Sequence, residues 1–342
     1  MKNIFHIIAL LTLMASCTKE IPFNGEEKKL RLVINSLITI GQPITAELGK
    51  TFFFLDNDGE IDTSIPEGLQ VDLYVNDQHM GTMEHSYDTL EYQGDMQPIL
   101  RQFFSNDYTP TEGDVIKIKA VAPGFEEATA STSALPRKPQ CTIISIEPVS
   151  LYQTEQNEED ENIPWFWLKS YAVMTLEITD TDPGQTNYFF INGSNDYLAF
   201  DENYPQASIT VRPTLNDPVF ENHSQAELDE LTSYYPFKDY TFTDALFENG
   251  SYRIQIPIDL IVNGLDINAV NKLQPKILLP VEAITKEYYR YLCSENIFQQ
   301  EMEGMVEPQK TYSNVTHGYG IVGGHHADTL IHQLPVPLAN KP

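Results

Sequence analysis

The sequence predicts a mainly β protein: an immunoglobulin-like antiparallel sandwich at residues 29–136, followed by a second β-rich domain at residues 139–335 with one or two embedded helices. Many short runs alternate apolar with polar residues, which is the period of a strand with one buried face. Turn-forming residues separate these runs. A length of 342 residues is also typical of two domains.

Residues 1–16 have the order of a bacterial secretory signal. Lys2 is followed by the apolar run Ile4–Leu13, and the small residues of Met14–Ser16 lead to Cys17. Cleavage of such a signal leaves the cysteine as a new, acylated N-terminus. The apolar run is too short to cross a membrane, which takes about 20 helical residues. We therefore expect lipidation at Cys17; the alternative is an ordinary cleaved signal with a spare cysteine.

Residues 17–28 are polar and predict a lipidated tether that leads to the first domain. The first strand is expected at Leu30–Ser36, where Leu30, Leu32 and Ile34 alternate with Lys29, Arg31 and Val33. Further strands are expected at Pro43–Leu48, Leu69–Val75, Val115–Ala122 and Ala128–Ser133. Their near-regular spacing is typical of an immunoglobulin-like sandwich. The Cys…Trp…Cys core of true immunoglobulin domains is absent, so only the architecture is implied.

The segment Leu135–Pro139 contains two prolines and interrupts the strand pattern. Because proline favours an extended segment without ladder hydrogen bonds, we place the domain boundary there. The acidic run Glu155–Glu161 predicts a loop in the second domain. Strands are expected at Cys141–Glu147, Ala172–Ile178, Asn187–Asn192, Ile209–Arg212, Ser251–Ile256 and Lys276–Val281.

Two helices are expected in the second domain. Ser224 and Glu227 have the spacing of a capping box, which predicts a short surface helix. A longer helix is expected near residues 285–301, because apolar residues recur there at helical spacing. Its apolar stripe consists of Ile284, Tyr288, Tyr291 and Leu292. Such a stripe predicts packing against a sheet rather than a ligand site.

The chain is strongly acidic, with 49 acidic and 21 basic residues and a formal net charge of −28. Such a surface repels phosphate backbones and anionic lipid headgroups, so we expect no nucleic-acid partner and no electrostatic docking to a membrane. The membrane is expected to be reached through the lipid. Solubility outside the cytoplasm accounts for the acidity; attraction of a cationic ligand is the alternative.

Apart from Cys17, the chain contains Cys141 and Cys293, too few for a disulfide scaffold or a cysteine metal site. Two separately buried thiols are the preferred interpretation, and a disulfide between them stays open. The sequence has no Gly-x-Ser-x-Gly elbow and no cysteine with a recognisable histidine partner. We therefore expect neither an enzyme nor a cofactor.

Two groups of residues are candidate metal ligands. His317, His325, His326 and His332 lie close together in the sequence. Adjacent His325 and His326 would point to opposite faces of a strand, so no metal site is expected, although metal binding by these histidines stays open. The run Asp56–Asp62, with Glu67 in register, resembles a calcium loop. The helices that flank such a loop are missing, so a solvated turn is expected.

The aromatic cluster Trp165, Phe166 and Trp167 follows the acidic loop and Pro164. Aromatic side chains contribute much of the binding energy at protein interfaces and also bind sugars and peptides. This cluster is the preferred ligand-contact site, with packing in the core as the alternative.

Several phrases resemble a family of Bacteroidota lipoproteins, the domain of unknown function 4249. The most specific are Glu307-Pro308, Tyr312–Val315 and Gly318–Gly324 near the C-terminus. Supporting phrases are Leu32–Asn35, Val121–Phe125, Asp182–Gly184, Asn187-Tyr188 and Lys286–Leu292. The resemblance implies an envelope lipoprotein that is often associated with TonB-dependent outer-membrane receptors, and it assigns no catalytic residue. The glycines of 318–324 are expected to form a tight hairpin or a bulge.

These observations together predict a non-enzymatic outer-membrane lipoprotein. We expect it to be an accessory or ligand-binding partner of a TonB-dependent receptor uptake system, a role that rests on the family resemblance. A cell-surface structural or adhesive lipoprotein is the alternative, and a secreted hydrolase is the third possibility. Whether the domains face the periplasm or the cell surface stays open.

Overall fold

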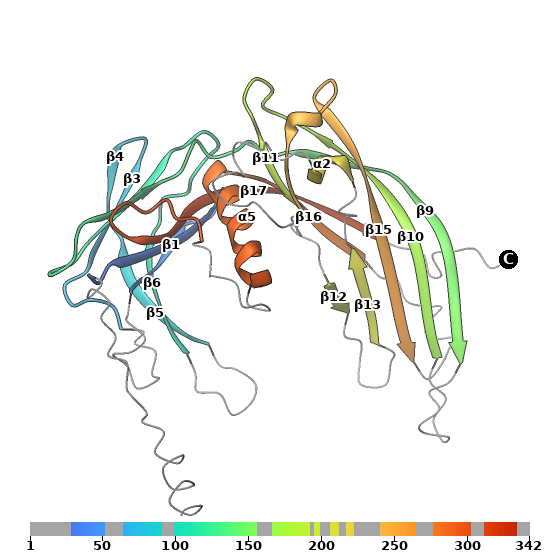
Figure 1. Cartoon of the computed structure of the whole chain (residues 1–342), viewed down its shortest axis with the longest axis horizontal. Coiled ribbons are helices and arrows are strands. Elements are labelled where there is room, and N and C mark those ends of the chain that lie inside the picture. The colour runs from blue at the N-terminus through green and yellow to red at the C-terminus, as the bar shows by residue number, and fades with distance from the viewer. Residues whose placement is uncertain are drawn as a thin grey trace, which may run out of the picture. The chain divides into compact units, whose positions relative to one another are not determined.

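The computed structural model describes residues 29–51, 64–90, 99–155, 166–191, 195–198, 206–211, 217–221, 240–264, 276–301 and 311–333. The described residues from Arg31 onward belong to one compact unit. They are mainly β-strands arranged in three sheets, and this confirms the predicted fold class (Figure 1).

The largest sheet has eight strands. They are β1 (Leu32–Thr39), β2 (Ile44–Lys50), β5 (Glu84–Leu90), β6 (Ile99–Asn106), β11 (Tyr188–Ile191), β14 (Thr241–Thr243), β16 (Lys276–Ile284) and β17 (Tyr319–Gln333). Their order is β14-β11-β16-β17-β1-β2-β6-β5. The sheet therefore joins strands from both ends of the described chain.

The second sheet has five strands and the third has four. The five are β9 (Gln140–Glu155), β10 (Phe166–Thr179), β12 (Asn195–Leu198), β13 (Gln206–Val211) and β15 (Ser251–Gly264). The four are β3 (Gln70–Val75), β4 (Gln78–Thr82), β7 (Ile116–Val121) and β8 (Ala128–Ser131). Their orders are β12-β13-β15-β10-β9 and β4-β3-β7-β8.

Strand β17 corrects the expectation of a hairpin at residues 318–324. It runs unbroken and pairs in parallel with β1, from Val33 opposite Tyr319 to Thr39 opposite His325. Gly320 has a φ of +107°, and a Cβ there would overlap the carbonyl oxygen of Ile34. The glycines therefore permit close approach of neighbouring chain segments within a strand, rather than a reversal of the chain.

One hydrophobic core lies between the four-stranded sheet and strands β1, β2 and β6 of the eight-stranded sheet. Ile34, Leu73 and Ile118, from β1, β3 and β7, are completely buried in it. The alternating burial along β1 and β7 matches the predicted strand period. Burial of one such side chain stabilises the fold by roughly 1.5–3 kcal/mol, so these alternating positions fix which face of each strand turns inward.

A second core lies between the five-stranded sheet and strands β11, β14 and β16 of the eight-stranded sheet. Met174, Ile256 and Leu279, from β10, β15 and β16, are completely buried there. Phe189 stacks on Phe242 with ring centroids 5.4 Å apart.

The predicted division of the chain into two domains at residues 136–139 stays a prediction. The structure adds that β17 lies in the same sheet as β1.

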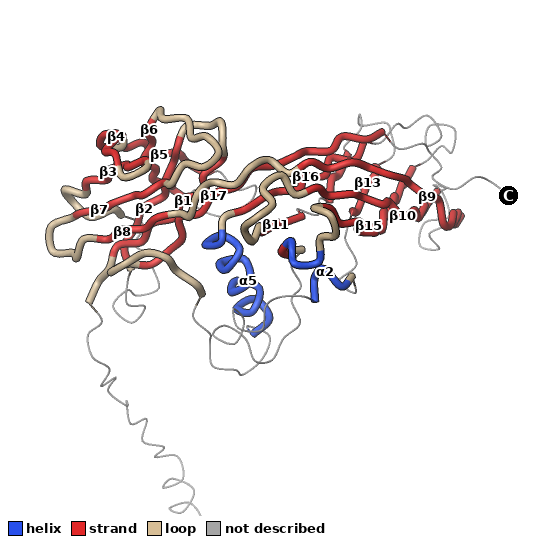
Figure 2. The backbone as a smooth tube through the Cα atoms, turned by 90° about the horizontal axis from the view of Figure 1, so that it is seen from above, coloured by secondary structure: helices blue, strands red, loops and turns tan. Residues whose placement is uncertain are grey.

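The predicted late helix is confirmed as α5 (Lys286–Glu301), which lies beside β17 and β11 (Figure 2). Among the side chains described in this helix, Tyr289, Cys293 and Ser294 are buried, and the first two pack with Ile284. Thr285 fixes the start of the helix, because its backbone N–H donates to the Gly324 carbonyl and its hydroxyl accepts from the Gly324 N–H. The buried residues Tyr289 and Cys293 thus each lie one position after Tyr288 and Leu292 of the predicted stripe.

Two short helical segments complete the described structure: α2 (Pro218–Glu221) and the 3₁₀ turn η1 (Asp244–Leu246). The capping box at Ser224 lies outside the described residues. None of the described helices is long and apolar enough to cross a bilayer.

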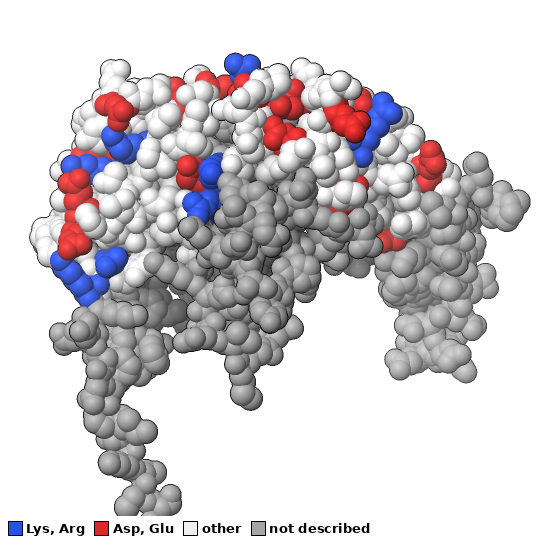
Figure 3. Space-filling model, turned by 45° about the horizontal axis from the view of Figure 1, so that its top comes forward, with Lys and Arg blue, Asp and Glu red and all other residues white. Residues whose placement is uncertain are grey.

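Acidic and basic side chains lie side by side on the face shown in Figure 3. Lys117 pairs with Asp77 at 2.6 Å, and Lys119 pairs with Glu127 at 2.8 Å. Exposed pairs of this kind each contribute about 0–1 kcal/mol. These lysines therefore pair with acidic neighbours, and the pairs contribute little to the stability of the fold.

Candidate functional site

The candidate site is an open polar cleft with a volume of about 690 Å³, here called the linker cleft. It is lined by Glu112, Arg137, Lys138, Pro139, Gln140, Cys141, Thr142, Thr181 and Asp328. Most of these residues belong to the proline-containing segment predicted as a domain boundary and to the start of β9. Segments far apart in the sequence therefore meet at the cleft.

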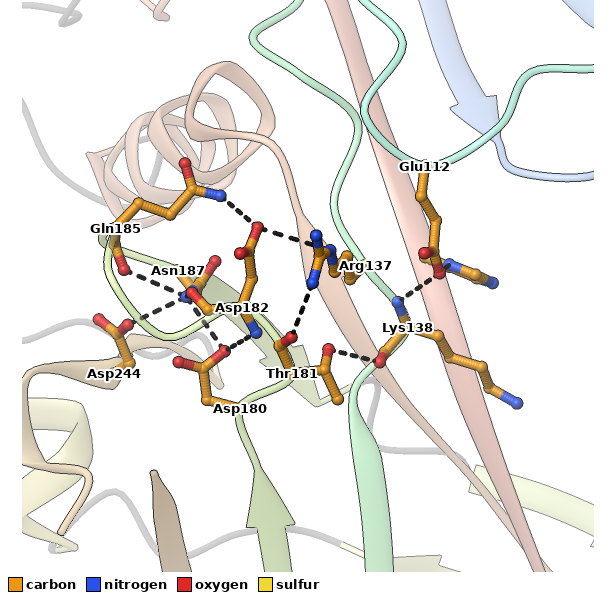
Figure 4. A network of polar contacts seen from close by, with 10 residues as sticks. Glu112, Arg137, Lys138, Asp180, Thr181, Asp182, Gln185, Asn187 and Asp244 are labelled. Carbon is orange, nitrogen blue, oxygen red and sulfur yellow. Dashed lines mark hydrogen bonds and ion pairs between the residues drawn. The ribbon is translucent and has the colours of Figure 1, made fainter. Parts of the chain in front are cut away.

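Hydrogen bonds hold the proline-containing segment in place. The backbone N–H of Lys138 donates to Glu112 at 3.0 Å, and the hydroxyl of Thr181 donates to the Lys138 carbonyl at 2.8 Å (Figure 4). The two prolines keep the segment extended, so its backbone groups are available to partners other than a sheet ladder. The segment is consequently a fixed wall of the cleft.

Asp328 of β17 connects this wall to the eight-stranded sheet. One carboxylate oxygen lies 3.0 Å from Lys138 Nζ, and the other accepts the backbone N–H of Cys141 at 2.9 Å. Asp328 therefore satisfies a charge and a backbone donor together. Hydrogen bonds to a charged group are stronger than neutral ones, so this residue is a main support of the cleft.

Arg137 is the second cation of the cleft, and it points toward the loop after β10 (Figure 4). Its Nη1 donates to the Thr181 carbonyl at 3.4 Å, and its Nε lies 3.9 Å from the Asp182 carboxylate. The Arg137 side chain is 57% exposed and that of Lys138 is 49% exposed. Both cations therefore remain accessible to a solute while they face carboxylates of the protein.

The loop next to the cleft is organised around Asn187. Its Nδ2 donates to oxygens of Asp180, Asp182, Gln185 and Asp244 at 2.9–3.2 Å (Figure 4). The amide nitrogen thus occupies the point where these oxygens converge. Burial, together with the nearby charges of Asp244 and Asp182, raises the pKa of Asp180 above its ordinary value of 3.8, although hydrogen bonds oppose the shift.

Cys141 lines the cleft but is poorly suited to nucleophilic chemistry. Burial, reinforced by the negative charge of Asp328, raises the pKa of its thiol to about 12. A thiolate is the reactive form of cysteine, so this thiol is protonated and unreactive at neutral pH. Cys141 is therefore a poor candidate for a nucleophile in this cleft.

The composition of the cleft limits what it can hold. Two cations, two carboxylates and the side chains of Gln140, Thr142 and Thr181 line it, and its lining contains no aromatic residue. A stacking platform for sugar rings or bases is absent from this lining. Hydrogen bonds and charge are therefore the interactions that this lining offers to a solute.

Two predicted histidine candidates face opposite sides of β17. His325 Nδ1 lies 2.7 Å from Glu282 Oε2, whereas His326 Nδ1 lies 3.2 Å from Glu112 Oε1. Burial lowers the pKa of His326 below its ordinary value of 6.5, against the opposing effect of Glu112. His317 is exposed in a turn with a φ of +58°, and His332 is exposed near the end of β17. Within the described part of the chain, no three His, Cys, Asp or Glu side chains are grouped to hold a metal.

His325 also contacts a hydroxyl, and this connection was not predicted from the sequence. Its Nε2 lies 2.8 Å from Thr39 Oγ1, so Glu282, His325 and Thr39 form a polar row across β16, β17 and β1. Glu282 is buried, and His325 and Thr39 are half-buried. The row lies outside the lining of the linker cleft, and it ties three strands of the sheet together.

The other predicted sites lie wholly or partly outside the described residues. Cys17, Trp165 and the whole run Asp56–Asp62 are not described, whereas Glu67 is. Phe166 and Trp167 begin β10, where their backbones pair with Gly264 and Asn263 of β15, but nothing is described of their side chains. The ligand-contact prediction for this aromatic cluster therefore stays a prediction. Cys141 and Cys293 are both thiols and are not joined in a disulfide.

Comparison with family models identifies one match, a domain of unknown function, DUF4249, over residues 18–331. The chain belongs to the DUF4249 family. Comparison of this DUF4249 protein with curated proteins gives no match. One solved structure, described as a membrane anchored protein from Corynebacterium diphtheriae, is 9% identical with a TM-score of 0.18. That comparison covers 75% of this chain, and this chain spans only 55% of the other protein.

Proposed function

We propose that this DUF4249 protein is an outer-membrane lipoprotein, held by acyl chains on Cys17, that acts as a non-enzymatic accessory or ligand-binding partner of a TonB-dependent receptor. The observation that carries the anchor is the order of a basic residue, an apolar run, small residues and Cys17. The match to the family begins at residue 18, directly after the expected acylated cysteine. The matched region therefore begins one residue after Cys17 and leaves the expected signal outside it.

The anchor requires more than one acyl chain. Each CH₂ group buried in the bilayer contributes about 0.8 kcal/mol, and a single myristoyl chain gives only reversible binding. A multiply acylated Cys17 would therefore keep the protein at the membrane without any basic surface. This agrees with the net charge of −28, which disfavours electrostatic attraction to anionic lipids.

The linker cleft supports a binding role. Its cations Arg137 and Lys138 are accessible, and its cysteine is held in the unreactive thiol form. A small polar solute is the ligand class that this lining favours. The proposal that the partner is a TonB-dependent receptor rests on the association known for the family. It does not rest on a contact in this structure.

The anchor is tested by a Cys17→Ala variant expressed in a bacterium that processes lipoproteins. Wild-type protein should incorporate labelled palmitate and sediment with the outer membrane, whereas the variant should do neither. Cys141→Ser is the matched control, since it removes a different thiol and should leave both readouts unchanged. Retention of the Cys17→Ala protein in the outer membrane without label would refute the lipid anchor.

The receptor association is tested separately. The tagged wild-type protein is purified from detergent-solubilised outer membranes, and co-purified proteins are identified by mass spectrometry. A TonB-dependent receptor should be recovered in stoichiometric amount. Recovery of the lipoprotein without any such receptor would remove this half of the proposal and leave the anchor intact.

A further inference from the structure

The edge strands of the three sheets differ in how they are protected. An edge strand presents unpaired backbone N–H and C=O groups, which are a template for pairing with another chain. The edges of the described sheets are β14 and β5, β12 and β9, and β4 and β8. Proteins normally shorten or bulge such edges, cover them, or place proline or charged side chains on them.

The long edge strand β9 is protected in three ways. The side chain of Asp328 accepts the backbone N–H of Cys141 near its start. Its pairing with β10 shifts register twice, between Tyr171 and Ala172 and between Thr175 and Leu176. Pro148 lies in the strand and has no N–H to offer. A partner strand cannot follow this edge without interruption.

The remaining edges, apart from β5, are short or covered. Strands β14 and β12 have only three and four residues. Strand β4 has five residues, and its pairing with β3 shifts register between Leu73 and Tyr74. The outer side of β8 is occupied, because Thr129 and Thr316 exchange backbone hydrogen bonds.

Within the described structure, strand β5 carries two acidic residues, Glu84 and Asp88, and has none of the other protections. All seven of its residues pair with β6 in continuous register, from Glu84 opposite Ser105 to Leu90 opposite Ile99 (Figure 1). It contains neither proline nor glycine. The side chains of residues 84–87 are exposed, and Tyr87 is 74% exposed. Over residues 84–87, the side chains on both faces of the strand are therefore open to solvent.

The inner side of β5 is held firmly to the sheet. His85 lies against the ring of Phe104, with centroids 5.0 Å apart, and its Nε2 is 3.1 Å from Gln102 Oε1. Phe104 itself is only 3% exposed and belongs to the first core. A strand fixed in this way is already in the conformation that an added strand needs, so less ordering is required on binding.

Charge identifies the kind of partner. Strand β5 contains Glu84 and Asp88 and no lysine or arginine. If two copies paired antiparallel about Ser86, Glu84 of one copy would lie opposite Asp88 of the other, and like charges directly opposite are destabilising. The net charge of −28 also makes two copies repel each other. A second copy is therefore disfavoured, and a basic segment is attracted.

We propose that β5 is a docking edge that accepts an extended, basic segment of another protein as an additional β-strand. Backbone hydrogen bonds along such an edge supply affinity, and alternate side chains supply specificity. This inference deepens the proposed accessory role and rests on it, because the strand would be supplied by the partner protein.

The test uses the full mature protein in detergent and a synthetic peptide of alternating lysine and valine. Amide hydrogen exchange is measured with and without the peptide. Slowed exchange in residues 84–90 is the expected result. A peptide of the same composition with a central proline, which cannot form a continuous strand, should give no protection. If residues 84–90 are not protected, or if both peptides protect them equally, the proposal is overturned.

Charge reversal tests the specificity. Glu84→Lys should weaken binding of the peptide about two- to fivefold, the range expected for one cross-strand charge pair. Glu147→Lys is the matched control, since Glu147 is an exposed glutamate in the protected edge strand β9. Equal weakening by both variants would show attraction to overall charge and would overturn the assignment to β5. Because peptide binding in detergent does not require acylation, its failure is distinct from failure of the lipid anchor.

Discussion

His325 Nδ1 lies 2.7 Å from the Oε2 of Glu282, on the neighbouring strand β16. Because the opposite ring nitrogen contacts Thr39 of β1 at 2.8 Å, one imidazole connects the two strands that flank β17. Glu282 is 7% exposed, so removal of its partner would leave a polar group buried. The pair is thus placed to hold the parallel and the antiparallel neighbours of β17 in register.

Glu282→Ala should destabilise the fold by about 1–3 kcal/mol, because it leaves the half-buried imidazole of His325 without its carboxylate partner. The free energy of unfolding is measured by urea titration. Glu177→Ala is the control, since Glu177 pairs with the exposed Arg253 and such pairs contribute about 0–1 kcal/mol. A loss for Glu282→Ala no larger than the loss for the control would contradict the role given to this contact.

Asp114 should be a stabilising carboxylate. It is 7% exposed and accepts hydrogen bonds from Asn76, Tyr108 and Thr111 at 2.9–3.0 Å. Asp114→Asn should destabilise the protein by about 1–3 kcal/mol at pH 7, because an amide cannot accept all of these bonds. Chemical denaturation of the two proteins measures the difference, and equal stabilities would count against this account.

The stabilisation by Asp114 should also depend on pH. Burial opposes ionisation, but the hydrogen bonds from Thr111, Asn76 and Tyr108 outweigh it and lower the pKa of Asp114 below 3.8. A carboxyl whose folded pKa is lowered stabilises the fold above its unfolded pKa, and this contribution is lost as the pH falls through the folded pKa. The gap between wild type and Asp114→Asn should therefore narrow below about pH 4. A gap that stays constant from pH 7 to pH 3 is the contrary result.

The contribution of Asp180 to stability should change with pH in the opposite direction. Its folded pKa is raised, so its protonated form is favoured in the folded state, and the favourable contribution is lost as the pH rises through that pKa. Relative to Asp180→Asn, the wild-type protein should gain stability as the pH falls from 7 toward 4. Paired denaturation curves across this range provide the measurement, and a relative loss of wild-type stability on acidification would show that the sign is wrong.

Gly320→Ala should destabilise β17 against β1. The added methyl would overlap the Ile34 carbonyl oxygen, and the φ of +107° is unfavourable for any residue with a Cβ. Gly41→Ala is the control, because Gly41 also has a positive φ, of +83°, but no atom within 4 Å of an added Cβ. Thermal unfolding should show a larger loss for Gly320→Ala. Equal losses would mean that backbone strain alone, and not close approach to β1, explains the glycine.

Local patterns in the sequence were sufficient to predict many strands and the late helix. The alternation at β1, β3 and β7 and the stripe leading into α5 follow directly from the periods of strand and helix. In contrast, β5, with its exposed polar residues, and β14, with three residues, show no such alternation. An exposed edge strand has no buried face to produce the pattern.

The parallel pairing of β1 with β17 was not predicted, because nothing local specifies contacts between the two ends of a chain. Gly320 was the available signal, since a methyl there would overlap the Ile34 carbonyl oxygen of β1. The linker cleft was likewise not predicted from the sequence. Its prolines were recognised as a break in the strands, but its partners Glu112, Thr181 and Asp328 come from distant segments.

The central claim is that acyl chains on Cys17 hold this DUF4249 protein at the membrane, and mass spectrometry of the N-terminal peptide from protein purified out of envelopes tests it most directly. The account predicts a peptide that begins at Cys17 and carries the mass of a diacylglyceryl group and a further acyl chain. An N-terminal peptide that retains residues 1–16, or that contains an unmodified Cys17, would contradict it.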